Sequence, residues 1–276
     1  MRLAHLGPRG TYTEAAALAF DSAADLLPVS TVTTAVEAVE AGQADAAVCA
    51  IENAIDGGIN ETIDLLLRED GQLHVRGEVV LAIHHALVGP AGIDVHGATV
   101  VYSHPSALGQ CRRRLAELAP NAKAVAALST TAAIEASMAE SGALAVGNRL
   151  SAELHHATIY AEDIADEPGN ETRFVVLAHE DAPRTGDDKT SIAFTTHHDR
   201  PGSLVEVLGI FSRRGINLTR IESRPTRRAL GTYVFLLDLQ GHRDDEGVAE
   251  AVEEARKVTL WLRVLGSYPR WTRTLA

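Results

Sequence analysis

Cysteine is scarce in this sequence, with 2 residues among 276. Cys49 and Cys111 lie in apolar surroundings and show no Cys-x-x-Cys spacing, so we expect buried free thiols, without a disulfide or a metal-binding motif. Free thiols fit a reducing compartment, and we therefore expect a cytoplasmic protein.

Long apolar runs are also missing. The longest, such as residues 79–83, fall far short of the ~18 residues that a membrane-spanning helix needs. Met1 and Arg2 lead straight into a strand-like segment, which is unlike an export signal. We expect a soluble protein with no membrane partner.

Positive charge is in deficit, because 25 basic residues stand against 37 acidic ones, a formal net charge of -12. Nucleic-acid binding needs a positive face, so this balance argues against a nucleic-acid partner. Local donors must then hold any anionic ligand. Histidines occur in adjacent pairs such as His84-His85 without His-Glu-x-x-His spacing, so we expect no metal site.

The sequence does have ample core material, with 46% hydrophobic residues, and its length suggests about two domains. Short apolar segments alternate with helical patterns in the first two thirds of the chain. The expected strands there are 3–6, 46–51, 79–88, 99–102, 123–127 and 143–146. This alternation predicts an α/β fold with largely parallel sheets, arranged either as one doubly wound sheet or as two smaller lobes.

Capping patterns predict two helix starts. Thr11 and Glu14 match a capping box that opens a helix running to about Phe20. Thr34 and Glu37 repeat the pattern. Gly42 is a natural stop for that second helix.

A change of composition near Ala182 predicts a linker, because residues 183–188 are polar and turn-rich. The remaining elements are expected to be strand 190–196, helix 202–214, strands 217–223 and 232–239, helix 244–257 and strand 260–267. This βαββαβ order is that of a ferredoxin-like unit. Asp199, Pro201 and Gly202 are expected to open its first helix, and Gly215 to end it.

Three loops in the first region are candidates for anion binding: residues 7–13, 51–58 and 103–111. Ligands collect at the carboxyl ends of strands in α/β sheets, where helix N-termini offer free amides. Any one loop taken alone could be purely structural. Their co-occurrence favours a shared carboxylate site.

Individual residues in these segments carry polar groups that suit a ligand. Asn53 beside Glu52 offers an amide, although a turn cap would explain it equally well. Ser103-His104-Pro105 fits either a helix cap or a ligand contact. After Asn170, the hydroxyl of Thr172 next to Arg173 suits an anionic substrate with a leaving oxygen. Residues 112–114, three arginines, are expected to form a solvated helix face.

Seven segments together carry a family resemblance. They are Gly7-Pro8-Arg9-Gly10-Thr11-Tyr12-Thr13-Glu14-Ala15-Ala16, Ile51-Glu52-Asn53, Ser103-His104-Pro105, Thr172-Arg173-Phe174, and residues 201–204, 215–225 and 230–233. In these residues the chain resembles the prephenate dehydratase family over nearly its whole length, with a catalytic domain fused to an ACT domain.

The resemblance implies a catalytic domain over residues 1–181. It would comprise two periplasmic-binding-protein-like lobes, about 1–80 with 160–181 and 81–159, and the cleft between them would be the active site. The implied catalytic residues are Thr172, Arg173 and Phe174. The implied substrate-binding residues are Thr11, Glu52, Asn53, Ser103, His104 and Asn170.

The resemblance further implies a regulatory ACT domain over residues 189–268. Such a domain binds phenylalanine at a subunit interface, which implies a homodimer or homotetramer. The implied contact residues are Gly202, Ser203, Leu204, Asn217, Leu218, Glu222, Ser223, Arg224 and Pro225. Phenylalanine would shift the oligomer between states of unequal affinity, and inhibition is the usual family behaviour.

The implied reaction needs little from a cofactor. Prephenate loses carbon dioxide and hydroxide together, and the electrons released by decarboxylation travel through the diene to the leaving hydroxyl. No metal or cofactor is needed as an electron sink, so we expect none. The Thr172 hydroxyl is expected to hydrogen-bond the departing hydroxide or relay a proton.

Three departures from the family pattern keep alternatives open. Ala54 stands where serine is usual, Ser106 where glutamine is common, and Ala50 where proline often occurs. Loss of the hydroxyl and the amide is expected to weaken substrate hydrogen bonds by about 1 kcal/mol each. A prephenate decarboxylase that does not aromatise, a non-catalytic amino-acid-binding regulator, and a preference for arogenate over prephenate all remain open.

Overall fold

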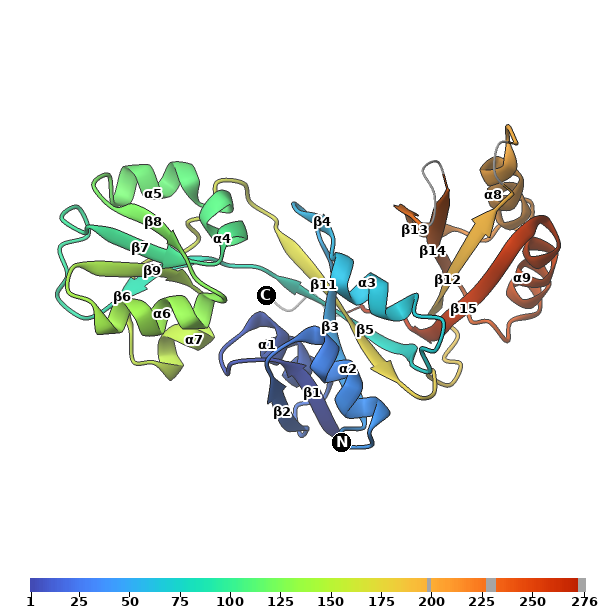
Figure 1. Ribbon diagram of the computed structural model, residues 1–276, viewed down its shortest axis with the longest axis horizontal. Coiled ribbons are helices and arrows are strands. Elements are labelled where there is room, and N and C mark those ends of the chain that lie inside the picture. The colour runs from blue at the N-terminus through green and yellow to red at the C-terminus, as the bar shows by residue number, and fades with distance from the viewer. Residues whose placement is uncertain (198–199, 227–231, 273–276) are drawn as a thin grey trace.

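Three β-sheets divide the chain (Figure 1). The computed structural model describes residues 1–197, 200–226 and 232–272, so Asp199, Leu230 and Gly231 of the expected motifs lie outside the described residues. Two sheets with flanking helices form what we call the first and second lobes, and the third sheet lies on the opposite side of the first lobe from the second lobe. The chain thus has two lobes in place of one doubly wound sheet.

The first lobe has the strand order β2-β1-β3-β11-β5, with β4 paired to β3. Its strands are β1 (Arg2–Leu6), β2 (Asp25–Val29), β3 (Ala46–Asn53), β4 (Gly57–Gly58), β5 (His74–Ala82) and β11 (Glu171–Ala178), and its helices are α1 (Tyr12–Phe20), α2 (Val32–Glu40) and α3 (Asn60–Leu66). β1 pairs in parallel with β2 and β3, whereas β11 is antiparallel to both β3 and β5. The expected largely parallel sheet is therefore mixed, because β11 returns from the second lobe.

The second lobe has the order β10-β6-β9-β7-β8 and is also mixed. Its strands are β6 (Ala86–Gly89), β7 (Val100–Ser103), β8 (Lys123–Ala126), β9 (Ala143–Gly147) and β10 (Thr158–Ala161), and its helices are α4 (Pro105–Gln110), α5 (Arg112–Leu118), α6 (Thr130–Ala139) and α7 (Arg149–Leu154). The single strand expected over 79–88 was wrong, since β5 and β6 belong to different sheets. The chain crosses between lobes at residues 83–85 and returns at 162–170.

The helix caps differ in detail from the expected patterns. Thr11 caps α1 by accepting from the Glu14 amide at 3.3 Å, but the Glu14 carboxylate accepts from the amide of Gly10 and not from that of Thr11. Thr31, not Thr34, caps α2, and its hydroxyl accepts from the Thr34 amide at 3.0 Å. Only Thr34 has a glutamate three residues on, as a capping box requires, so the pattern pointed past the hydroxyl cap that Thr31 provides.

The third sheet confirms the expected βαββαβ order, with strands arranged β13-β14-β12-β15. Its elements are β12 (Asp188–Thr196), α8 (Ser203–Arg213), β13 (Leu218–Pro225), β14 (Tyr233–Gln240), α9 (Glu246–Val258) and β15 (Thr259–Pro269). No helix in the described part of the chain is long and apolar enough to cross a membrane. Cys49 and Cys111 are buried and free.

The first lobe and the third sheet share one hydrophobic core. Side chains of both pack in it, among them Ala4, Val36, Val75, Val175, Ala193, Leu236, Leu265 and Tyr268. Gly266 on β15 has a φ of 147°, and a Cβ there would lie 2.3 Å from the Val75 carbonyl oxygen on β5. Only glycine lets the two strands approach this closely.

We expect Gly266→Ala to destabilise the protein by about 3 kcal/mol, because the added methyl group overlaps backbone atoms that cannot yield. The measurement is the midpoint of urea unfolding. Gly247→Ala is the matched control, since a Cβ at that position in α9 meets no atom within 4 Å. A Gly266 variant as stable as the control would contradict the close packing.

Candidate active site

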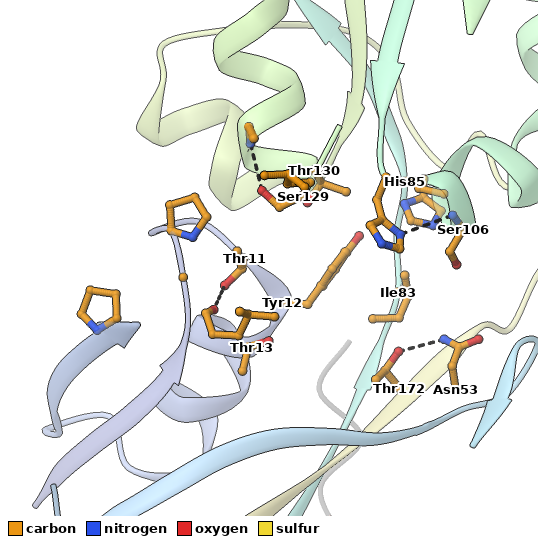
Figure 2. A pocket seen from close by; sticks show the side chains of 18 of the residues that line it. Thr11, Tyr12, Thr13, Asn53, Ile83, His85, Ser106, Ser129, Thr130 and Thr172 are labelled. Carbon is orange, nitrogen blue, oxygen red and sulfur yellow. Dashed lines mark hydrogen bonds between the residues drawn. The ribbon is translucent and has the colours of Figure 1, made fainter. Parts of the chain in front are cut away.

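A cavity of about 630 Å³ lies between the two lobes (Figure 2). All three candidate loops contribute to it, together with residues of both crossing segments. The lining residues are Leu6, Gly7, Pro8, Thr11, Tyr12, Thr13, Pro28, Val29, Ser30, Asn53, Ile83, His85, His104, Ser106, Ala107, Gln110, Leu128, Ser129, Thr130, Ala132, Asn170 and Thr172. Both lobes therefore contact the same ligand-sized space.

Thr172 and Asn53 form a hydrogen-bonded pair at the cavity wall (Figure 2). They are direct partners across the antiparallel strands β11 and β3. The Asn53 Oδ1 accepts from the amides of Ile55 and Asp56, both at 3.0 Å, so its Nδ2 faces Thr172 and donates to Oγ1 at 2.8 Å. Because Oγ1 already accepts this bond, the Thr172 hydroxyl can donate its own proton to a ligand.

A chain of polar side chains crosses the cleft from Asp56 in the first lobe to Gln110 in the second. Asp56 Oδ2 accepts from Ser106 Oγ and, at 2.9 Å, from Gln110 Nε2. The Asp56 carboxylate thereby fixes the orientation of the Gln110 side-chain amide. Its Oε1 then lies 2.9 Å from both Asn170 Nδ2 and His85 Nε2. Ser106 stands where glutamine is common in the family. Gln110, one helical turn further on, supplies a side-chain amide in its place.

Among the described residues, two buried acceptors beside this polar network have no protein partner. Gln110 Oε1 can only accept, so His85 carries its proton on Nε2, and its Nδ1 has no hydrogen-bond partner in the described part of the chain. The same holds for Asn170 Oδ1, and Asn170 is 3% exposed. Tyr12 lies edge-on to His85 with ring centroids 6.2 Å apart. A ligand hydroxyl or carboxylic acid could satisfy these acceptors.

The N-termini of helices α1 and α6 meet the cavity. Thr11 and Ser129 are their N-caps, and both line the space, as do Thr13 and Thr130 in the first helical turns. Free amides and the helix dipole make such termini favourable for anions. No arginine or lysine occurs among the described residues that line the cavity, so an anion there depends on these amides and on neutral side-chain donors.

The structure brings five of the nine expected catalytic and substrate-binding residues to the cavity: Thr11, Asn53, His104, Asn170 and Thr172. The other four lie elsewhere. Ser103 is fully buried and donates to the Val146 carbonyl at 2.8 Å. Phe174 is packed in the core of the first lobe.

Glu52 and Arg173 also lie away from the cavity, because neighbouring residues on a strand point to opposite faces. With Asn53 and Thr172 turned to the cleft, Glu52 and Arg173 turn to the third sheet. Arg173 binds Asp238 on β14 at 2.5 Å and donates to the Tyr268 hydroxyl at 2.8 Å. Sequence proximity to Thr172 therefore does not mean contact with the ligand.

The residues expected to bind phenylalanine occupy two environments. Gly202, Asn217, Ser223 and Pro225 are exposed, and Ser203, Leu204 and Leu218 are half-buried. Two others face the first lobe. The carboxylate of Glu222 packs against Gly58, and Arg224 donates to the Asn60 carbonyl at 3.0 Å and pairs with Asp64 at 2.9 Å.

Sequence reasoning did not single out several other cavity residues. Tyr12 and Gln110 lie within the expected loops 7–13 and 103–111, whereas the following lie outside all three loops: Val29, Ser30, His85, Ser129 and Thr130. The Ser129 cap followed by an apolar helical pattern could have signalled a fourth loop of the expected kind. Nothing local marks His85, which lies in a segment that crosses between the lobes. Among the described residues, no cluster of three or more His, Cys, Asp or Glu could hold a metal ion.

A largely apolar cavity with a few converging polar groups lies between two α/β lobes, and a βαββαβ unit follows them in the chain. This arrangement defines a two-lobed protein with a small-molecule site and an appended ferredoxin-like domain. Residues 3–182 match the family described as Prephenate dehydratase, and residues 190–257 match the ACT domain. The chain belongs to the prephenate dehydratase family.

Named relatives agree with this assignment. The bifunctional chorismate mutase/prephenate dehydratase of Aquifex aeolicus is 40% identical, covering 98% of this chain and 74% of its own length. The prephenate dehydratase of Mycobacterium sp. (strain JLS) is 39% identical, covering 98% of this chain and 90% of its own. The structure of prephenate dehydratase from Arthrobacter aurescens in complex with L-Phe has a TM-score of 0.88 at 37% identity, covering 98% of this chain and 90% of that one.

The burial of His85 predicts how kcat/KM depends on pH. Burial lowers the pKa of His85 below its ordinary 6.5, although the hydrogen bond with Gln110 opposes this. His85 is thus neutral above pH 6.5, with Nδ1 able to accept a hydrogen bond from the ligand. That acceptor is lost as the pH falls through the lowered pKa. We expect kcat/KM to be flat above 6.5 with an acid limb below it.

The check is a pH profile of kcat/KM for the wild type and for His85→Gln, which cannot be protonated. The variant should lack the acid limb that the wild type shows. An acid limb centred above pH 6.5, or one that the variant keeps, would contradict the role given to His85.

Proposed function

We propose that this chain is a prephenate dehydratase, converting prephenate to phenylpyruvate in phenylalanine biosynthesis with regulation by phenylalanine. One observation carries the chemical assignment. The Thr172 hydroxyl lines the interlobe cavity and accepts from Asn53, which leaves its proton free for a departing oxygen.

In this proposal Thr172 stabilises the leaving hydroxyl. A threonine hydroxyl is a weak acid, so it hydrogen-bonds the developing hydroxide instead of ionising fully. Asn53 fixes the direction of that bond, because its own amide is held by the backbone of residues 55 and 56. Such preorganisation costs no reorientation when the charge develops.

The two carboxylates of prephenate are held by the helix N-termini in this account. The amides at the starts of α1 and α6 take the place of basic side chains, which fits the net charge of -12. A weakly held ring carboxylate suits the reaction, since that group must leave as carbon dioxide. Strong pairing with an arginine would stabilise the ground state and slow its loss.

The Asp56–Gln110 contact keeps the cleft closed over the substrate in this proposal. It joins the first lobe to α4 of the second lobe at 2.9 Å and orients His85 and Asn170. Closure excludes water from the reacting carboxylate. Aromatisation supplies the driving force, and the residues of this chain need only bind, orient and donate.

The proposal also covers regulation by phenylalanine, the roles of the two domains and the cellular location. Phenylalanine binds the ACT domain near 202–204 and 217–225, at an interface between copies of the chain in a dimer or tetramer. Residues 1–181 form the catalytic part and 189–268 the regulatory part. Buried free thiols at Cys49 and Cys111 support a location in the reducing cytoplasm.

Product identification tests the proposed function. Purified protein is incubated with prephenate, and the products are followed by the absorbance of phenylpyruvate and by chromatography. Phenylpyruvate with an equal amount of carbon dioxide is the expected result. A non-aromatic keto acid would indicate a decarboxylase that retains the hydroxyl, and unchanged prephenate would leave only an amino-acid-binding regulator. Parallel assays with arogenate establish which of the two substrates has the higher kcat/KM.

A further inference from the structure

A charged network connects the reverse side of the Asn53–Thr172 pair to the third sheet. Arg173, 11% exposed in its side chain, is the centre of it. In addition to its contacts with Asp238 and Tyr268, Arg173 forms an ion pair with Glu78. The Arg173 Nε lies 2.7 Å from Glu78 Oε2, without hydrogen-bond geometry. Glu78 is held in turn by Lys189 at 2.8 Å.

The network reaches the partner strand as well. Glu52, the direct partner of Arg173 across β3 and β11, lies 3.6 Å from Arg173 Nη1 and 3.3 Å from Arg220 Nε. Arg220 on β13 also pairs with Glu222, and Glu222 packs against Gly58 of β4. Thus each residue of the Asn53–Thr172 pair has a neighbour that is tied to the third sheet.

Buried ion pairs hold β3 and β11 of the first lobe firmly to the third sheet. Asp238 is 3% exposed in its side chain, and burial alone would raise its pKa, yet the charges of Arg173 and Arg220 and the Ser191 hydroxyl lower it. Burial would lower the pKa of Arg173, but Asp238, Tyr268 and Glu78 hold it well above its usual value. Both groups stay ionised, and moving either one would break an ion pair between two buried side chains.

We propose that Arg173 is a positioning residue that transmits the state of the ACT domain to Thr172 and Asn53. The proposal rests on the proposed function and on Thr172 as its donor. A shift of β13 or β14 by a ligand moves Arg220 and Asp238. Glu52 and Arg173 follow, and the backbone they share with Asn53 and Thr172 changes the direction of the Thr172 hydroxyl. Arg173 itself never meets the substrate.

The test uses variants in the third sheet that cannot touch the cavity. Asp238→Asn removes the charge that holds Arg173. Tyr268→Phe changes no charge and removes the hydroxyl that accepts from Arg173 and also bonds Ser191. Thr190→Val is the matched control, because it also removes one buried hydroxyl from the third sheet, bonded to Gly241 and Ser267 but not to Arg173. For each, kcat is measured without and with saturating phenylalanine, and phenylalanine binding by calorimetry.

We expect saturating phenylalanine to change the wild-type kcat by about 5-fold or more, the usual range of allosteric coupling. In Asp238→Asn this factor should fall below about 2-fold while calorimetry still detects phenylalanine binding. Tyr268→Phe should lose part of the response, and Thr190→Val none. Arg173→Lys, which keeps the charge but not the two-pronged geometry, should behave as Asp238→Asn does.

Several outcomes would overturn the coupling alone. They are an unchanged phenylalanine response in Asp238→Asn and Tyr268→Phe, an equal loss in Thr190→Val, or a wild type that converts prephenate without any response. Should Asp238→Asn fail to fold, Tyr268→Phe decides, since it keeps every charge. A wild-type chain that leaves prephenate unchanged would instead remove the proposed function itself.

Discussion

Thr172→Ala is expected to lower kcat by roughly 10²-fold, with a much smaller change in KM. The hydroxyl is needed where charge develops on the leaving oxygen, and removing one such donor typically costs about this much. Steady-state kinetics with prephenate measure both constants. Because Asn53 stays tied to the backbone of Ile55 and Asp56, the cavity should keep its shape in the variant.

Thr172→Ser is the matched control, because it keeps the hydroxyl and the bond from Asn53. We expect it to retain turnover within about 10-fold of the wild type. A loss in Thr172→Ala that is confined to KM would mean that Thr172 only binds the substrate. Equal losses in both variants would point to a packing role for the methyl group.

Arg173→Met is expected to destabilise the protein by about 3–5 kcal/mol, the cost of leaving a buried partner charge uncompensated. Asp238 would remain as a carboxylate, 3% exposed, without its ion pair to Arg173 and with only the charge of Arg220 and the Ser191 hydroxyl acting to lower its pKa. The measurement is the urea midpoint at neutral pH. Because the native pKa of Asp238 is lowered, its pairing stabilises above its ordinary 3.8 and is lost as the pH falls through the lower native value.

The double variant Arg173→Met/Asp238→Leu removes both charges and should recover about 1–3 kcal/mol of that loss. Recovery of this size would show that the single variant suffers from the unpaired charge. A single variant of wild-type stability would mean that Arg173 and Asp238 are not paired in solution, and the proposed coupling would lose its physical basis.

Much of the fold could be predicted because its signals are local. The short apolar runs of β1, β3, β7 and β9, the Thr11 cap and the βαββαβ order all depend on residues near one another in the chain. The split of 79–88 into β5 and β6 could not be predicted in this way. Both strands are apolar, and only the assignment to two different sheets separates them.

Asn53, His104, Asn170 and Thr172 stand out in the sequence as polar groups at strand ends and helix caps, and Thr11 lies in a candidate loop. Their roles in the site were implied by the family resemblance. The errors came from strand pairing. Which of Thr172 and Arg173 faces the cleft depends on how β11 pairs with β3. The paired residues lie about 120 positions apart in the chain, and no local pattern encodes their register. The partners of Arg173 lie further off still, on β14 and β15.

The rate of aromatisation in a single turnover tests the central claim most directly. Excess enzyme is mixed rapidly with prephenate, and phenylpyruvate formation is followed in the wild type, Thr172→Ser and Thr172→Ala. The account predicts one fast exponential in the first two and a rate lower by roughly 10²-fold in the third, with prephenate bound in all three. Equal rates in the wild type and Thr172→Ala would contradict it.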